Sequence, residues 1–134
     1  MQFKTGNEKR KTNNGIYQLL IYLPRKSFIT IGKKGSFEFP KGYYIYTGSA
    51  KNGLKKRLDR HKTKDKKLFW HIDYLLEYGK IKDFWVRSKG SECDWNRKVL
   101  KRAESKIILS GFGSSDCRCP AHLVYFARKP KWGT

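Results

Sequence analysis

The sequence is poor in acidic residues and in long apolar stretches. Asp and Glu number 11 against 31 Lys and Arg, so the chain of 134 residues has a formal net charge of +20. Charge of one sign at this density attracts polyanions, and nucleic acid is the expected partner because its phosphates present regularly spaced negative charge. No apolar run reaches the roughly 20 residues of a membrane-spanning helix, and no stretch has the pattern of a long basic amphipathic helix. We therefore expect no membrane association.

Cysteine is also scarce. The three cysteines are too few and too odd in number for a disulfide framework, which favours a reducing, intracellular (cytoplasmic) location. Residues 1–14 are polar and basic and lack the apolar segment of a signal peptide, so a flexible leader is expected there. The length and the 38% of apolar residues predict one folded domain over residues 15–128, followed by a short tail over 129–134.

Apolar, β-prone runs predict strands through the first half of the chain. Residues 15–23 are apolar on both alternating faces, which indicates a strand covered on both sides. Residues 28–31 and 36–39 flank a Gly-Lys-Lys-Gly turn and predict a hairpin. A further strand is expected over about 43–48. Two later strands are predicted over residues 81–87 and 121–128.

Helical periodicity predicts three helices, over residues 53–62, 68–78 and 91–109. In the first helix Arg57 and His61 lie one turn apart and border the apolar stripe, so both should face the sheet. The third should be the longest. Ser91 begins it with a capping-box pattern and places Glu92 on its buried stripe. Together these elements predict an α/β (α+β) fold, a single small domain in which helices flank a mainly antiparallel sheet of five or six strands.

Several motifs carry a resemblance to a known family. Gly-Ile-Tyr at 15–17 opens the first strand, Tyr-Thr-Gly at 46–48 ends a later one, and Arg57 follows in a helix. This order resembles the GIY-YIG endonuclease superfamily. The segment GFGSSDCRCPAHL at 111–123 and Trp-His-Ile-Asp-Tyr at 70–74 are similar to a small stand-alone branch of that superfamily, of the DUF123 type, which is best known as an uncharacterised domain.

The resemblance implies hydrolysis of phosphodiester bonds with one divalent metal ion, Mg²⁺ or Mn²⁺, and without a small-molecule cofactor. Tyr17 and Tyr46 match the tyrosines of the two motifs. One of them would help to deprotonate the attacking water, and the other would hold phosphate or water. Arg57 matches the arginine that contacts the scissile phosphate, and His61 matches a second proton-transfer position. Glu92 matches the carboxylate that binds the metal ion.

The chemistry of these residue types agrees with that implication. Phosphate hydrolysis needs an activated water and positive charge on the transition state. Tyrosine has a pKa of about 10, so a tyrosine base needs positive charge nearby. A single carboxylate suits Mg²⁺, which keeps most of its waters. Thr47 replaces the isoleucine of the second motif, and Glu104 is the alternative metal ligand.

Each candidate also has a purely structural interpretation. The two tyrosines are of a type common in strands, and a lone histidine such as His61 is more often packed or solvated than catalytic. Arg57 could pair with Asp73 or Asp116. Glu92 could only complement the positive end of its helix.

The segment around Cys117, Cys119 and His122 raises the question of zinc. Zinc sites normally space two cysteines by two to four residues and use four ligands, which Cys-Arg-Cys does not match. Packed, reduced thiols are therefore predicted at Cys117 and Cys119.

The main hypothesis is a metal-dependent endonuclease that hydrolyses DNA rather than RNA, directed at particular structures or at single strands. A non-catalytic DNA- or RNA-binding module on a degenerate nuclease scaffold is the alternative, and an RNA-associated basic protein is a third possibility. Five cations near the first helix are expected to contact nucleic-acid phosphates. They are Lys51, Lys55, Lys56, Arg60 and Lys64.

Overall fold

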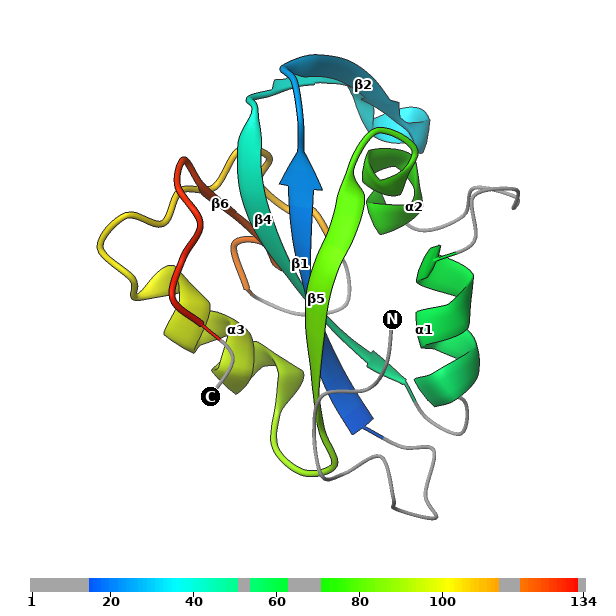
Figure 1. Ribbon diagram of the computed structural model, residues 1–134, viewed down its shortest axis with the longest axis vertical. Helices are drawn as coiled ribbons and strands as arrows, with labels where there is room; N and C mark the ends of the chain where they lie inside the picture. Colours follow the sequence, from blue (N-terminus) through cyan, green and yellow to red (C-terminus); the bar gives the residue numbers. More distant parts are fainter. Residues whose placement is uncertain (1–14, 51–53, 63–70, 114–118, 133–134) are drawn as a thin grey trace.

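The computed structural model describes residues 15–50, 54–62, 71–113 and 119–132. Its centre is a four-stranded sheet in the order β5-β1-β4-β6 (Figure 1). The strands are β1 (Gly15–Leu23), β4 (Gly42–Ala50), β5 (Lys80–Arg87) and β6 (Leu123–Phe126). Every neighbouring pair in this sheet is antiparallel. The predicted α+β class with a mainly antiparallel sheet is confirmed.

The other two described strands form a separate hairpin, β2 (Ser27–Ile31) and β3 (Gly35–Phe39). A short 3₁₀ helix, Gly32–Lys34, makes the turn, and Gly32 and Gly35 both have positive φ angles that glycine adopts without strain. The predicted hairpin is confirmed. The predicted sheet of five or six strands is divided in two, because β2 packs against a helix instead of extending the central sheet.

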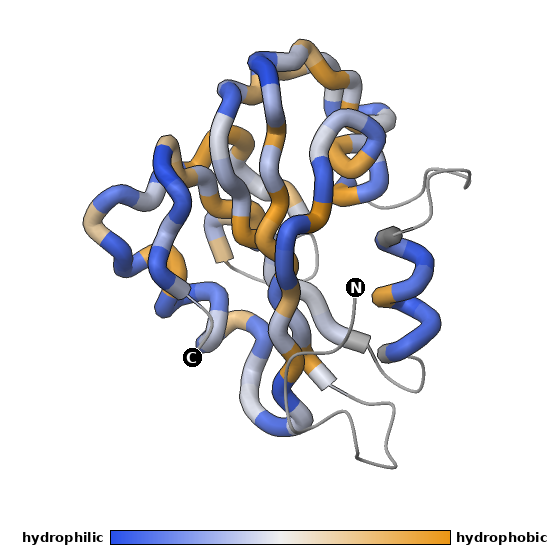
Figure 2. Tube along the Cα trace, viewed as in Figure 1, coloured by the Kyte–Doolittle hydropathy of each residue, from blue (hydrophilic) through white to orange (hydrophobic). Residues whose placement is uncertain are grey.

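The sheet is covered on both faces. The helices are α1 (Leu54–Lys62), α2 (His71–Leu76) and α3 (Glu92–Leu100). Odd-numbered side chains of β1, among them Tyr17 and Leu23, pack with the hairpin, α1 and α2, whereas Leu20 packs with Val99 of α3 and with β6. We call these surfaces the α1 face and the α3 face. Hydrophobic residues are concentrated in the central strands, while α1 is largely hydrophilic (Figure 2). No helix in the described part of the chain is long and apolar enough to cross a membrane.

The third helix is shorter than predicted. α3 ends at Leu100 instead of residue 109 and, with nine residues, is no longer than α1. Ser105 Oγ donates to Leu100 O at 2.9 Å, which satisfies a carbonyl at the helix end. Lys106 then exchanges two backbone hydrogen bonds with Tyr125 of β6. The prediction of one long helix is wrong because pairing along β6 supplies backbone partners that a continued helix would exclude.

The chain after β6 folds back onto the α3 face. Trp132 lies within residues 129–134, which the sequence suggests are a tail, and it packs against the core of this face. Its Nε1 donates to Oε1 of the buried Gln18. Gln18 Nε2 in turn donates to Thr47 Oγ1 at 3.0 Å. The end of the described chain is therefore tied to the strand that carries the second tyrosine motif.

Candidate active site

The predicted site residues gather around residues 47–49 of β4, which we call the junction. In the register between β1 and β4, Tyr17 lies opposite Gly48, and Leu19 lies opposite Tyr46. Directly paired residues project from the same face of a sheet, so both tyrosines project from the α1 face. A Cβ atom added at Gly48 would lie 2.6 Å from Tyr17 Oη and 3.1 Å from Tyr46 Cε2. The absence of a side chain at Gly48 is what lets the two phenols approach β4.

His61 joins the two tyrosines. It is on α1, and its Nε2 lies 2.8 Å from Tyr17 Oη. The centroid of its ring lies 5.4 Å from that of Tyr17 and 6.2 Å from that of Tyr46. Tyr17 is 1% exposed and His61 3%, so their hydrogen bond is shielded from bulk water. The prediction, made from helical spacing, that His61 faces the sheet is confirmed.

Arg57, one turn before His61, also points to the junction. Its Nη1 donates to Ser49 O at 2.5 Å. Of the two structural partners considered for Arg57, Asp73 forms an ion pair with Arg60 at 2.7 Å, and Asp116 lies outside the described residues. The guanidinium is thus held beside the junction by a backbone carbonyl.

Both tyrosines are neutral phenols in this environment. Burial raises the pKa of Tyr17 well above its usual value, and the neighbouring Tyr46 raises it further, whereas Arg57 lowers it. Burial also raises the pKa of Tyr46, as does the charge of Glu92, again against Arg57. The charge on Glu92 acts on both phenols, so the acid and the tyrosines belong to one electrostatic site.

Glu92 reaches the site from the α3 face. Ser91 caps α3 by accepting a first-turn backbone N–H at 3.2 Å, as the capping pattern predicts. Glu92 Oε2 lies 2.8 Å from His122 Nδ1, and its side chain is 28% exposed. Burial by itself would raise the pKa of Glu92, but hydrogen bonds from His122 and Ser49 and the charge of Arg57 outweigh it and lower that pKa. The carboxylate is therefore ionised at neutral pH.

Glu104, the alternative metal ligand, has a different environment. It lies in the turn after α3, where its side chain is 59% exposed and its Oε1 accepts from Arg102 Nε at 3.4 Å. Its charge is not among the causes that shift the pKa of either tyrosine. Of the two acids, Glu92 is the one that acts on the tyrosines.

His122 links Glu92 to two cysteines. Its Nδ1 lies 3.1 Å from Thr47 O as well as 2.8 Å from Glu92 Oε2. Both neighbours are acceptors, so Nδ1 carries the hydrogen. Its Nε2 faces Cys93 Sγ at 3.8 Å. Cys93, Cys119 and His122 form a group that could hold a metal ion, because their ligand atoms lie within 4.8 Å of one another. We call this group the thiol cluster.

The sequence does not predict the thiol cluster because its ligands come from segments far apart in the chain. Cys117 lies outside the described residues, and Cys93, far away in the sequence, lies beside Cys119 and His122. Gly48, Ser49 and His122 were likewise not predicted as site residues. The signal that could have found Cys93 is its position directly after Glu92 in the first turn of the helix.

A comparison with models of protein families gives a match over most of the chain. A model described as Domain of unknown function DUF123 matches residues 16–132. The chain belongs to the DUF123 family. The resemblance to this branch is confirmed, and the match extends to Trp132, which packs on the α3 face. Neither the search of curated proteins nor the search of solved structures gives a match.

Two of the predicted phosphate contacts of this DUF123 domain lie on the outer surface of α1. Lys55 and Lys56 are exposed, and Lys55 Nζ lies 3.2 Å from Asp59. Arg60 is in a different position, since its side chain is 26% exposed and pairs with the fully buried Asp73. Its guanidinium therefore stabilises a buried carboxylate. The other two predicted contacts lie outside the described residues: Lys51 and Lys64.

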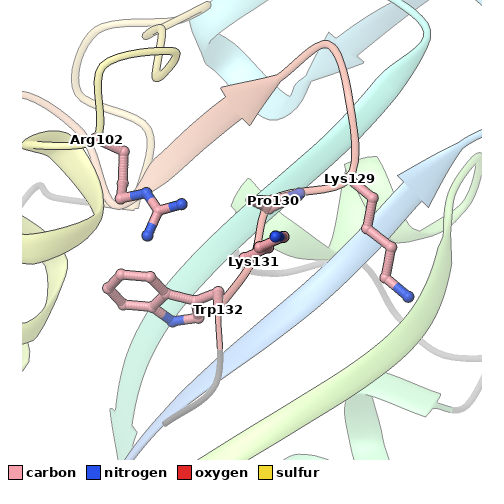
Figure 3. A pocket seen from close by; sticks show the side chains of 5 residues that line it. All are labelled: Arg102, Lys129, Pro130, Lys131 and Trp132. Carbon is pink, nitrogen blue, oxygen red and sulfur yellow. The ribbon is translucent and has the colours of Figure 1, made fainter.

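The DUF123 domain also has an open pocket on the α3 face, of about 560 Å³. The Arg102 guanidinium lies over the Trp132 ring, 5.9 Å from its centroid, and the lysine side chains extend from the same segment as the indole (Figure 3). None of the residues predicted to be catalytic lines it. The lining residues are Arg102, Lys129, Pro130, Lys131 and Trp132.

Proposed function

We propose that this protein is a metal-dependent endonuclease that hydrolyses phosphodiester bonds in DNA, directed at single strands or branched structures. The observation that carries the proposal is the convergence on the junction. Two phenols and a histidine reach it from the α1 face, and a guanidinium is hydrogen-bonded to a junction carbonyl. An ionised carboxylate from the α3 face interacts electrostatically with the phenols and the guanidinium. Together they would supply a proton acceptor, positive charge and a metal ligand, which phosphate hydrolysis uses.

The surroundings of Glu92 fit a hard divalent cation. Its carboxylate is ionised and partly exposed, and the bonds from His122 and Ser49 do not exhaust the roughly four lone-pair sites of a carboxylate. Mg²⁺ commonly binds through one or two carboxylates and completes its shell with water and phosphate. Glu92 would hold Mg²⁺ or Mn²⁺, and a bound ion would stabilise negative charge on the phosphate and acidify a water.

We assign proton transfer to Tyr17, because its Oη is hydrogen-bonded to His61 Nε2. When His61 is the acceptor in that bond, Tyr17 can give its own hydroxyl proton to Nε2 as it takes one from water, which leaves hydroxide and a protonated His61. Tyr17 then never has to persist as a phenolate, which its raised pKa disfavours. This role explains why a tyrosine and a histidine are paired in a shielded position.

Tyr46 and Arg57 would bind the phosphate. A guanidinium binds phosphate oxygens in bidentate geometry, and the bond to Ser49 O fixes its position at the junction. Tyr46, half-buried beside Tyr17, would direct its hydroxyl to a phosphate oxygen or the attacking water. The exposed Lys55 and Lys56 on α1 would attract the DNA backbone.

The test is cleavage of end-labelled single-stranded, branched and duplex DNA with Mg²⁺ or Mn²⁺, and with a chelator as the blank. We expect the wild type to cut at least one of the single-stranded or branched substrates in a metal-dependent reaction. Glu92→Ala and Tyr17→Phe should lose this activity, and the matched controls Glu104→Ala and Tyr22→Phe should keep it. No cutting by any of the proteins, or equal cutting by all of them, would overturn the proposal.

The observation that favours the alternative, a non-catalytic nucleic-acid-binding module, is the depth of Tyr17. Tyr17 is almost fully buried, and a substrate has no exposed Tyr17 surface to contact directly. A binding module predicts tight, salt-sensitive DNA or RNA binding that is unchanged in Tyr17→Phe. Binding of this kind without metal-dependent cleavage would support the module over the enzyme.

A further inference from the structure

We propose that the thiol cluster binds one thiophilic divalent ion, zinc in the reduced protein, at a site separate from the hard-cation site on Glu92. The ligands would be the two thiolates of Cys93 and Cys119 and Nε2 of His122. Cys93 comes from the first turn of α3, and the other two come from the segment that enters β6. The ion would therefore cross-link two parts of the α3 face. Its binding does not depend on nuclease activity.

The distances within the cluster are close to those of a tetrahedral zinc site. Bonds of about 2.3 Å to sulfur and about 2.05 Å to nitrogen place tetrahedral ligand atoms roughly 3.6–3.8 Å apart. Cys93 Sγ and His122 Nε2 lie 3.8 Å apart, and no separation in the cluster exceeds 4.8 Å. Side-chain rotations that close at most about 1 Å would complete the geometry.

The protonation of His122 already suits a ligand. Glu92 Oε2 and Thr47 O both accept from Nδ1, so in the neutral ring the lone pair is on Nε2, which faces the sulfur of Cys93. Zinc-bound histidines commonly donate their second N–H to a carboxylate or a backbone carbonyl. His122 has one partner of each kind. Glu92 would thus serve as an outer partner of this site while it presents its carboxylate to the hard cation.

The backbone holds the two loop ligands in place. His122 N–H donates to Phe112 O at 2.8 Å, and Thr47 N–H donates to His122 O at 3.0 Å. The buried Asn96 of α3 donates from Nδ2 to Ala121 O at 2.7 Å. The segment is therefore fixed to both α3 and β4 before any ion binds, which reduces the ordering that binding would require.

The donor set selects against the ion proposed for Glu92. Thiolates and imidazole bind Zn²⁺ strongly, whereas Mg²⁺ requires oxygen ligands. Cys119 is 9% exposed and His122 1%, and Cys93 is half-buried, so water would reach the fourth position from the side of Cys93. Three protein ligands and a water complete a four-coordinate ion.

Cobalt substitution tests the proposal in the wild-type protein, because Co²⁺ replaces Zn²⁺ and has a visible spectrum. The full chain is purified with a reductant, stripped with a chelator and titrated with Co²⁺. We expect one equivalent to bind, with a near-ultraviolet thiolate charge-transfer band and the intense visible bands of a tetrahedral ion, and Zn²⁺ should then displace it. Two results would overturn the proposal. One is the weak bands of an octahedral ion without a charge-transfer band, and the other is that Cys93 and Cys119 remain joined as a disulfide in the presence of reductant.

Variants then test the ligands. Cys93→Ser and Cys119→Ser should each halve the charge-transfer intensity and weaken binding by more than about 100-fold, beyond the 10- to 100-fold loss typical of outer partners and expected for Glu92→Ala. His71→Gln is the matched control for His122→Gln, since the His71 ring is also hydrogen-bonded to the backbone, through Gly113 N–H, but lies outside the cluster. This readout does not measure DNA cleavage. Cobalt binding without nuclease activity would therefore support the thiol-cluster metal site and contradict only the proposed nuclease function.

Discussion

The two faces of the sheet meet at the junction but differ in chemistry. On the α1 face, Tyr17, Tyr46 and His61 are aromatic and largely shielded from water. On the α3 face, Glu92 and His122 form a charge-assisted pair in contact with the thiol cluster. Burial raises the pKa of both phenols and keeps them neutral, whereas hydrogen bonds lower the pKa of Glu92 and keep its carboxylate ionised. In the proposed function, the α1 face would supply proton transfer and the α3 face would bind the cation.

The faces also differ in what positions them. Strand pairing fixes Tyr17 against Gly48, so the α1 face follows directly from the β1–β4 register. On the α3 face, side-chain bonds connect Glu92 to His122 and to Ser49. The α1 face should therefore be disrupted by an added atom at the close contact of Tyr17 with Gly48. The α3 face should be disrupted by removal of a hydrogen-bonding side chain.

The largest effect should come from removing the carboxylate of the α3 face. Glu92→Ala deletes the proposed ligand of the hard cation, and we expect single-turnover DNA cleavage in Mn²⁺ to fall about 1,000-fold, the upper end of the loss of one electrostatic group. Glu104→Ala removes an exposed acid of the same type and should cut at the wild-type rate. Equal rates for both variants would contradict the assignment of the metal site.

A smaller effect should come from the α1 face. Tyr17→Phe keeps the ring but removes the hydroxyl that bonds His61, and cleavage should fall about 100-fold, a typical loss of one proton-transfer group. Urea denaturation should show a loss of only about 1 kcal/mol. Tyr22→Phe, on the same strand with its ring against Tyr43, is the control. A Tyr17→Phe enzyme of normal activity would remove Tyr17 from the mechanism.

Adding one methyl group tests the junction itself. In Gly48→Ala the new Cβ would approach Tyr17 Oη to 2.6 Å, so the ring must move. We expect a loss of about 1–3 kcal/mol in the free energy of unfolding and a 10- to 100-fold loss of activity, roughly what a misplaced catalytic group costs. Cobalt binding at the thiol cluster should persist. Unchanged stability and activity would show that the α1 face does not depend on this close approach.

The smallest effect concerns pH and a contact between the faces. Gly113 N–H donates to His71 Nδ1 at 2.9 Å, and a Cβ at Gly113 would lie 3.0 Å from Tyr46 and 3.4 Å from His122. Burial, aided by the charge of Lys34, lowers the pKa of His71 below its usual 6.5. The neutral ring therefore contributes stability that is complete above pH 6.5 and is lost as the pH falls through the lowered pKa.

Thermal unfolding between pH 7.5 and 4.5 checks this prediction. The wild type should lose more stability on acidification than His71→Gln, which cannot titrate at this position. Both proteins should have parallel curves above pH 6.5. A wild-type curve that runs parallel to that of His71→Gln down to pH 4.5 would contradict the predicted role of His71.

The α1 face could be predicted from the sequence because its determinants are local. Tyr17 is in an apolar, β-prone run that predicts a strand, and the helical spacing of Arg57 and His61 directs both toward the same sheet. The family resemblance supplied the order of the motifs, and strand pairing then brings Tyr17 to within ring contact of Tyr46.

The α3 face could be predicted only in part. Capping chemistry located Glu92, but nothing in the spacing of Cys93 and Cys119 indicates that a helix and a distant loop bring them together. The sequence predicts too late an end for α3 because apolar periodicity continues after Leu100, while backbone pairing of Lys106 with β6 decides the structure. Contacts between segments far apart in the sequence decide both features.

Anomalous diffraction from crystals soaked with Mn²⁺ tests most directly whether both faces serve one hydrolytic site. We predict a manganese peak about 2.1 Å from a carboxylate oxygen of Glu92, on the side facing Arg57 and Tyr46. A map without a peak at Glu92, or with manganese only among the thiols of Cys93 and Cys119, would contradict this account.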